Sequence, residues 1–321
     1  MRTRLALLIA VVGLLAGPAA AQTPPPTIEP PVLEDPDAVL VQELVVRGHL
    51  PGPAWWRVSD EDTTVYVLGV PSLAPKRMQW DRSIFERRLE GANEVILPFV
   101  NVKAKLGGSI GAAWNLLRLK SGGPFEKRLD PATRARFVAV RERLGHDADH
   151  YDTKNPLAAG VQLAIDYRDA NELTNMDPAK LVRLLAERKG VKVVSKSYDL
   201  GAQLGRILRT PASVGRLCFD EVLAQAEAGP GVTRAAAAAW AQGDVDGALA
   251  NERTYERCLA AIPGARTYDE RTKADQAAAI AEALKTPGHA IALVPLRPLL
   301  AQNGVLARLS AQGFTVKTPA E

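Results

Sequence analysis

The strongest constraint on the fold is a change of hydrophobic period along the chain, from strands near both ends to helices between them. Residues 55–58 and 63–68 are β-branched and aromatic runs separated by a short acidic turn, which predicts a hairpin. Residues 290–294 and 314–317 have the same strand character near the other end. From about 102 to 286 the helical period dominates. We therefore predict an α/β (α+β) fold, with a mixed β-sheet core formed by the N- and C-terminal thirds and a large helical insertion in the middle.

N-cap residues and prolines indicate where the helices begin. Asp130 and Asp177 each precede a proline, as an N-cap residue precedes the first helical position. A short helix between strand 63–68 and a strand at 94–97 predicts parallel pairing through a crossover. The expected helices cover 81–89, 130–144, 156–167, 177–188, three or four segments between 212 and 261, 269–284 and about 298–311.

The first 21 residues have the three parts of a secretory signal peptide. Arg2 and Arg4 form a basic start, an apolar stretch runs from Leu5 to Leu15, and an A-x-A cleavage site ends at Ala21. The apolar stretch is too short to cross a bilayer as a helix. We expect cleavage after Ala21 and a periplasmic or secreted protein; an uncleaved anchor is the alternative.

Residues 22–38 form a proline-rich segment that we predict to be a disordered tether. It contains six prolines, three of them consecutive, among polar and acidic residues. Such a composition favours an extended polyproline II chain and cannot bury a core. The remaining residues, 39–321, fit a single domain that contains the helical insertion at about 102–286.

The charge balance argues against nucleic acid as a partner. Lys and Arg number 40 against 36 Asp and Glu, and loss of Arg2 and Arg4 with the signal peptide lowers the formal net charge from +4 to +2. A slight excess of this kind provides no basic surface stripe. Because no other long apolar run occurs, we also expect no transmembrane segment after signal cleavage.

Cys218 and Cys258 are the only cysteines, and an even pair in an exported protein is a disulfide candidate. Both lie in helical patterns separated by glycine-containing segments, so antiparallel helices can bring them together. We predict a disulfide between them; two buried free thiols are the alternative.

Two of the four histidines are spaced as metal ligands often are. His146 and His150 are four residues apart and lie among three aspartates, a set that a divalent cation can use. The alternative is a polar loop or helix start in which the aspartates act as N-caps, and the neighbouring Gly145 and Pro156 favour the loop. His289, in a turn before a strand, is expected to face solvent.

The motifs at the two ends also resemble a known family. Trp55–Asp60 is followed by Thr64-Val-Tyr-Val-Leu-Gly-Val-Pro-Ser-Leu-Ala-Pro75, and Ile291 begins Ile-Ala-Leu-Val-Pro-Leu-Arg-Pro-Leu-Leu-Ala-Gln-Asn-Gly304. In order and placement these stretches resemble the motifs of the TraB/GumN family, relatives of the Tiki metalloproteases in the wider erythromycin-esterase/ChaN-like group. The resemblance covers about a third of the chain.

The resemblance implies a divalent-metal site whose ligands are replaced here. The family's proposed ligands are the His of a G-x-x-H in each end motif and a Glu at the close of the strand after the first helix, a set that can hold an activated water. At the two histidine positions this chain has Ser72 and Pro298, and at the glutamate position it has Pro98. Proline has no side-chain ligand atom, and the hydroxyl of Ser72 is a poor metal ligand compared with imidazole, so none of these residues replaces an imidazole or a carboxylate.

Of three further positions of the implied site, one is kept and two are replaced. The first glycine is kept as Gly69, but the second is Pro295. A short strand is also expected at 191–194 within the helical region, and the family often has an acidic residue after it. Here that position is Lys196, whose charge repels a cation.

We therefore interpret the chain as an exported TraB/GumN-like protein that is a catalytically degenerate pseudoenzyme. No catalytic residue and no cofactor are expected, and the implied partner is a peptide or an unidentified envelope protein. The alternative is a metal-dependent hydrolase or protease with a relocated divalent-metal site at His146 and His150.

Overall fold

The computed structural model describes residues 33–45, 51–99, 101–103, 117, 122–175, 177–199 and 207–319. The expected signal peptide, residues 22–32 of the expected tether, and His49 lie outside these residues. Residues Val32–Glu321 form one unit, to which the description below applies.

The predicted strands and helices appear in the predicted order along the chain, together with four short strands that were not predicted. The strands are β1 (Trp55–Ser59), β2 (Thr63–Val70), β3 (Ala74–Pro75), β4 (Glu94–Ile96), β5 (Asn101–Lys103), β6 (Leu173–Thr174), β7 (Lys192–Val194), β8 (Ser197–Asp199), β9 (Gly288–Pro295) and β10 (Thr315–Lys317). The four that were not predicted are β3, β5, β6 and β8. The helices are α1 (Ser83–Leu89), α3 (Pro131–Arg143), α4 (Pro156–Ala170), α5 (Asp177–Arg188), α7 (Ala212–Ala228), α8 (Gly231–Ala241), α9 (Val245–Leu249), α10 (Thr254–Ala260), α11 (Ala265–Ala283), α12 (Leu296–Leu300) and α13 (Val305–Ala311). Short 3₁₀ helices are η1 (Gln42–Leu44), η3 (Phe125–Arg128) and η4 (Ala148–Tyr151).

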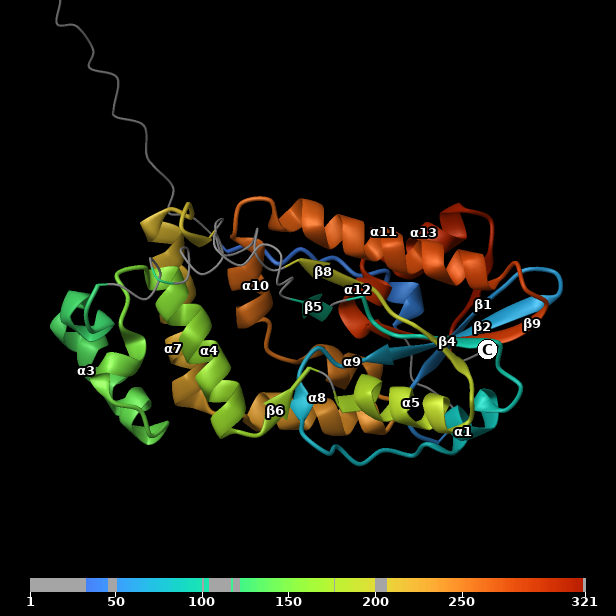
Figure 1. Cartoon of the computed structure of the whole chain (residues 1–321), viewed down its shortest axis with the longest axis horizontal. Coiled ribbons are helices and arrows are strands. Elements are labelled where there is room, and N and C mark those ends of the chain that lie inside the picture. The colour runs from blue at the N-terminus through green and yellow to red at the C-terminus, as the bar shows by residue number, and fades with distance from the viewer. Residues whose placement is uncertain are drawn as a thin grey trace, which may run out of the picture. The chain divides into compact units, whose positions relative to one another are not determined.

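A six-stranded mixed sheet forms the core, in the order β10-β1-β2-β9-β4-β7. β1 pairs antiparallel with both β10 and β2, whereas the β2–β9, β9–β4 and β4–β7 pairs are parallel. Residues 290–294 of β9 are apolar and fully buried, which is typical of a strand covered on both faces. α11 and α13 lie over one face of the sheet, and α1 and α5 lie over the other (Figure 1). The predicted fold class is confirmed.

The crossover prediction is right in direction and wrong in its partner strand. β2 and β4 are parallel, but β9 lies between them and pairs with both. The apolar run 290–294 of β9 is the reason, because the position covered by helices on both faces requires the most continuously apolar strand.

The single helix expected at about 298–311 is instead two helices, α12 and α13, with a turn before Gly304. A Cβ atom on Gly304 would lie 2.5 Å from the carbonyl oxygen of Pro298 and 2.6 Å from that of Ala301. The chain turns so tightly here that it folds back on α12, and only glycine leaves room for this approach.

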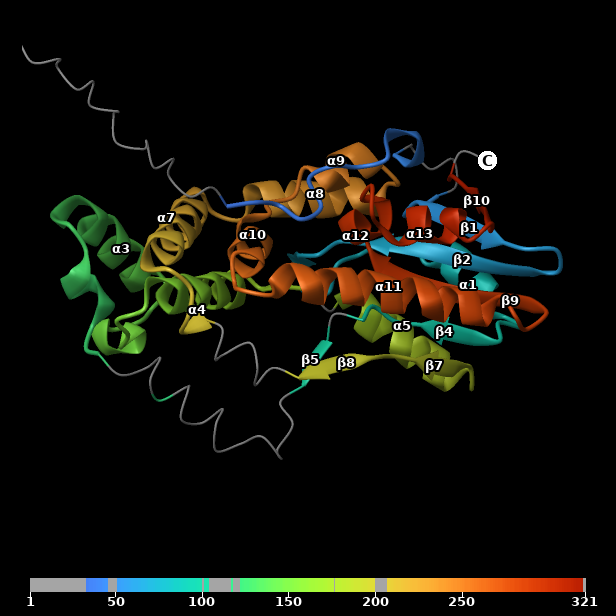
Figure 2. The ribbon, with the colours of Figure 1, turned by 90° about the horizontal axis from the view of Figure 1, so that it is seen from above.

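The helical insertion has a hydrophobic core of its own. α4 and α7 lie side by side (Figure 2). A Cβ on Gly160 would lie 3.1 Å from the Cα of Phe219, so a residue without a side chain allows the two backbones to come close. Phe125, Phe137 and Phe219 are buried and meet edge to face.

Cys218 on α7 and Cys258 on α10 lie at disulfide distance, with 2.14 Å between the sulfur atoms and 5.1 Å between the Cα atoms. Both side chains are fully buried in the core of the insertion. The pairing predicted from the sequence is therefore present, and it joins α7 to α10.

Residues 33–38, which the composition placed in the tether, lie against the domain. Leu33 and Asp37 are buried, and the backbone of Val41 donates a hydrogen bond of 2.9 Å to the carbonyl of Leu300. The packed chain thus begins before residue 39, because an apolar side chain and paired acidic groups outweigh the proline-rich composition at this point. In the part of the chain described, every helix is too short or too polar to cross a bilayer.

Candidate functional site

Four neighbouring parallel strands, β2, β9, β4 and β7, end at the same edge of the sheet. We call this the carboxyl edge. In open α/β sheets, ligands bind just outside the carboxyl ends of the strands, so this edge is where a site is expected.

The six positions singled out by the family resemblance all belong to the carboxyl edge. Gly69 and Pro295 are in the last residues of β2 and β9, where Val70 is in register with Pro295. The other four follow the ends of β2, β4, β7 and β9, and they are Ser72, Pro98, Lys196 and Pro298 respectively. Segments far apart in the sequence are therefore brought to one edge.

Apolar side chains close the carboxyl edge around Gly69. The indole of Trp240 donates a hydrogen bond of 2.5 Å from its Nε1 atom to the carbonyl oxygen of Gly69. A Cβ on Gly69 would lie only 2.4 Å from Cδ1 of Leu296. The gap beside Gly69, next to Trp56 and Trp240, has no room for a water molecule. The surroundings of Gly69 therefore leave no space for a hydrated ion.

The edge around Pro98 is held by an amide side chain. Pro98 is buried, and Gln276 of α11, which is 2% exposed, bonds the residues on both sides of it. Its Oε1 atom accepts a hydrogen bond of 2.9 Å from the backbone of Phe99, and its Nε2 atom donates one of 3.5 Å to the carbonyl of Leu97. These contacts fix the loop after β4 on both sides of Pro98.

Lys196 forms an ion pair within the domain. Its Nζ atom lies 2.6 Å from Oδ2 of Asp275, which also accepts a hydrogen bond of 2.6 Å from the hydroxyl of Tyr198. Burial alone would raise the pKa of Asp275, but the hydrogen bonds from Lys196 and Tyr198 outweigh it and lower the pKa. The lysine charge is thus neutralised by a neighbouring carboxylate.

A buried ionic network connects the N-terminal segment to α10 and α11. Lys273, only 1% exposed, lies 2.6 Å from Asp37 and 2.7 Å from Asp269. Burial opposes the charge of Lys273, yet the two carboxylates outweigh it and raise the pKa. Arg253 binds Asp35 through two hydrogen bonds of 3.0 and 2.7 Å. Such paired charges hold their elements in place, because an unpaired member would be costly to bury.

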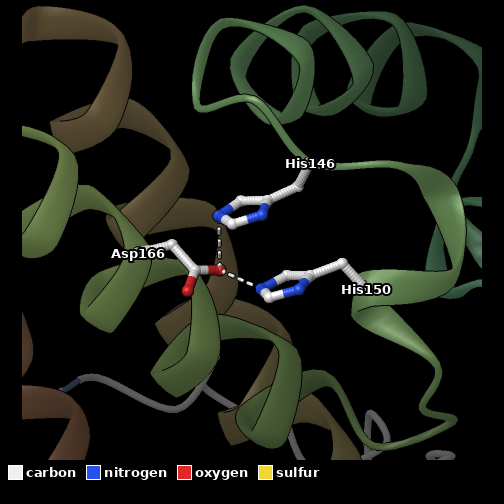
Figure 3. Close-up of side chains that lie close together, drawn as sticks. All are labelled: His146, His150 and Asp166. Atoms are coloured by element: carbon white, nitrogen blue, oxygen red, sulfur yellow. Dashed lines mark hydrogen bonds and ion pairs between the residues drawn. The ribbon is translucent and has the colours of Figure 1, made fainter.

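A second cluster lies in the helical insertion, where His146 and His150 meet Asp166 of α4 (Figure 3). Oδ2 of Asp166 lies 2.8 Å from Nε2 of His150 and 3.8 Å from Nε2 of His146. The two imidazole rings are stacked, with centroids 3.8 Å apart and planes 4° apart. The structure therefore brings both predicted histidines to one carboxylate.

The acidic residues next to these histidines in sequence are not the ones that complete the cluster. Asp147 acts as the N-cap of η4 and accepts a hydrogen bond of 3.1 Å from the backbone of His150, as the loop interpretation expects. Sequence reasoning missed Asp166. Its signal is a carboxylate on an otherwise apolar face of α4, where Leu163 and Tyr167 are buried.

His289 differs from its expectation. It belongs to β9 rather than to a turn, it is half-buried, and its Nε2 atom lies 2.8 Å from the carbonyl of Arg88. Its ring meets that of Tyr66 edge to face. The strand begins earlier than predicted because Gly288, in register with Thr63, already pairs with β2.

A surface groove of about 380 Å³ opens at the opposite end of the sheet from the carboxyl edge. It lies between the turn after β1, the end of α11 and the start of β10. Leu284 and Phe314 provide apolar surface, and Asp60 and Lys285 provide charges of both signs. We call it the amino-edge groove.

The fold and the edge together define a class of protein: a mixed α/β domain with its site positions on adjacent parallel strands and a helical insertion between the sheet halves. A sequence model of the TraB/PrgY/gumN family matches residues 54–318. The chain belongs to the TraB/PrgY/gumN family. No curated protein and no solved structure was found to match it.

Proposed function

We propose that this chain is an exported member of the TraB/PrgY/gumN family that binds a peptide or an envelope protein without catalysing a reaction at the carboxyl edge. The observation that carries the proposal is the chemistry of that edge. Where the resemblance implies two imidazoles and a carboxylate, the chain has Ser72, Pro98 and Pro298. The tight packing around Gly69 supports it further, because a catalytic metal needs an open coordination position.

Export is supported by two observations of different kinds. The first 21 residues have the pattern of a cleavable signal peptide. Cys218 and Cys258 lie at disulfide distance, and disulfides persist in oxidising compartments such as the periplasm.

The amino-edge groove is the surface that best fits a bound peptide. Its volume of about 380 Å³ is in the range of small ligand sites, and it combines apolar with charged side chains. An extended peptide can place an apolar side chain against Phe314 and a charged one near Asp60 or Lys285.

A peptide-library assay tests this function. Tag-free mature protein is mixed with peptides of defined sequence, and binding and cleavage are followed together by affinity selection and mass spectrometry. We expect bound, intact peptides with or without added Zn²⁺ or Mn²⁺, and weaker binding by Phe314→Ala. Val232→Ala is the matched control, since Val232 is an exposed apolar residue outside the groove. Cleavage that chelators abolish, or no peptide binding at all, would contradict the proposal.

A metal-dependent hydrolase with a relocated site is the second candidate function. The specific observation in its favour is the convergence of His146, His150 and Asp166. This function requires peptide cleavage that depends on added metal and is lost in His150→Ala. The same assay thus separates the two candidates, because a binding protein leaves its peptides intact in both forms.

A further inference from the structure

His146, His150 and Asp166 present three donor atoms to one point, outside the carboxyl edge. One nitrogen from each imidazole and one carboxylate oxygen all lie within 4.8 Å of one another (Figure 3). Tetrahedral Zn²⁺ with ligands at about 2.0–2.1 Å separates its donor atoms by roughly 3.3 Å. The observed distances of 2.8 and 3.8 Å from Asp166 to the two imidazoles bracket this value. Because imidazole lone pairs lie in the ring plane, the two stacked rings must turn toward each other to share an ion.

The carboxylate of Asp166 is oriented by partners that leave it facing the histidines. Its side chain is 7% exposed. Oδ2 accepts a hydrogen bond of 2.6 Å from the hydroxyl of Tyr151, and Oδ1 accepts one of 2.8 Å from Nε2 of Gln162. Hydrogen bonds of this kind hold metal-ligating carboxylates in place and are a regular part of metal sites.

The turn that carries both histidines is also fixed. Arg141 donates a hydrogen bond of 2.7 Å to the backbone carbonyl of His146, and its guanidinium is held by Glu126 at 3.0 Å. Asp147 caps the backbone of His150. The backbone positions of both histidines are therefore fixed before an ion binds, so binding costs little conformational entropy.

The ligand types and the exposure of the cluster suit a divalent ion. The two imidazole rings lie side by side, with centroids 3.8 Å apart. Neutral imidazoles are good ligands, and both rings are about 30% exposed, which gives an ion a path from solvent. Two nitrogens and one oxygen suit Zn²⁺ better than Mg²⁺ or Ca²⁺, which prefer oxygen alone.

We propose that His146, His150 and Asp166 bind one Zn²⁺ ion, which joins the turn at η4 to helix α4. The site is independent of the peptide-binding function proposed above. Without the ion, the same residues form a hydrogen-bonded clamp between η4 and α4, and this is the competing outcome.

Zinc titration of the tag-free mature protein, stripped with a chelator, tests the site. We expect one Zn²⁺ per chain by isothermal titration calorimetry and no comparable binding of Mg²⁺. Zinc at about 100 times its Kd should raise the Tm by about 5 °C. His146→Ala and His150→Ala should each weaken zinc binding at least 10-fold, and Asp166→Asn should do so while keeping an acceptor for Tyr151.

Asp149→Asn is the matched control, because Asp149 is an exposed carboxylate in the same turn and is not part of the cluster. Its zinc affinity should equal that of the unmodified protein. Circular dichroism of each variant shows whether it is folded, and the isosteric Asp166→Asn variant keeps the test decisive if an alanine variant is not. Absence of zinc binding, or binding that survives loss of both imidazoles, would overturn the proposal in favour of the clamp.

Discussion

The carboxyl edge and the cluster of His146, His150 and Asp166 each differ from what their place in the fold implies, and they differ in opposite ways. At the carboxyl edge, four parallel strands end where α/β sheets bind ligands, yet the side chains there are proline, serine and a lysine already paired with Asp275. In the helical insertion, three ligand-type side chains converge although the family resemblance implies no site there. The comparison teaches that the arrangement of strands in a fold does not by itself decide where ligand-type side chains converge.

The two regions also differ in how their charged groups are paired and buried. Near the carboxyl edge the ionic groups are paired within the domain, as Lys196 is with Asp275 and the buried Lys273 is with Asp37. In the cluster, one buried carboxylate faces two half-exposed imidazoles. The first arrangement holds elements together, whereas the second is accessible to an ion from solvent.

Replacing the buried Lys273 is expected to lower the free energy of unfolding more than the other substitutions. It tests whether the paired charges near the carboxyl edge hold the domain together. Lys273→Met leaves Asp37 and Asp269 without their cation in a buried place. Loss of one partner from a buried ion pair costs about 3–5 kcal/mol. Urea unfolding followed by circular dichroism measures the loss.

Lys285→Met provides the control for this variant, since Lys285 pairs with Glu282 at the exposed surface. Its free energy of unfolding should change by less than about 0.5 kcal/mol. Equal effects of the two substitutions would show that the Lys273 network is not a structural element of the edge.

Removing the cysteine pair probes the stability of the helical insertion. The separation of 40 residues between Cys218 and Cys258 corresponds to about 3–4 kcal/mol in the chain-entropy account. Cys218→Ala combined with Cys258→Ala should therefore lower the urea midpoint, and reducing agent should lower that of the unmodified protein by a similar amount. Free-thiol labelling before reduction should find no reactive thiol; two labelled cysteines would contradict the bond.

The sequence was sufficient to predict the sheet, the insertion and the cysteine pair. Period and cap residues identify single elements well: Asp130 accepts its N-cap hydrogen bond from Thr133, and the following proline begins α3 as expected. The insertion of β9 between β2 and β4 could not be predicted in this way, because strand order depends on which strand is best covered from both faces. Gly304 likewise interrupts a helical pattern through a backbone approach that no local signal reports.

The place of each site in the fold was easier to predict from the sequence than the residues that form it. His146 and His150 are neighbours in sequence, but Asp166 joins them from another helix through tertiary packing. Asp37 belongs to a proline-rich stretch that composition assigns to a tether, and only its pairing with Lys273 shows that it is folded. Contacts between distant segments depend on the packing of whole elements, which hydrophobic period does not encode.

A methyl group at Gly69 tests how tightly the carboxyl edge is closed. In Gly69→Ala the new Cβ meets Cδ1 of Leu296 at 2.4 Å and the ring of Trp56 at 3.0 Å, so neighbouring side chains must move. Overpacking of this kind costs about 1–3 kcal/mol, to be measured as a shift of the urea midpoint. Gly231→Ala is the control, because a Cβ there meets no atom within 4 Å and the position is helical. A tolerated Gly69→Ala would mean that the edge has space for a ligand.

Low pH is expected to weaken the packing of residues 33–38 against the domain. This is the smallest of the expected changes in stability. Burial alone would raise the pKa of Asp35, but its hydrogen bond and charge interaction with Arg253 outweigh it and lower the pKa below 3.8. The ionised carboxylate therefore stabilises the folded state above that pH, and the contribution is lost as the pH falls through the lower folded-state pKa. Urea midpoints at pH 6 and pH 3 should accordingly differ less in Asp35→Asn than in the unmodified protein. An unchanged difference would assign the acid sensitivity to other carboxylates, such as Asp275 at the carboxyl edge, whose pKa is lowered in the same direction.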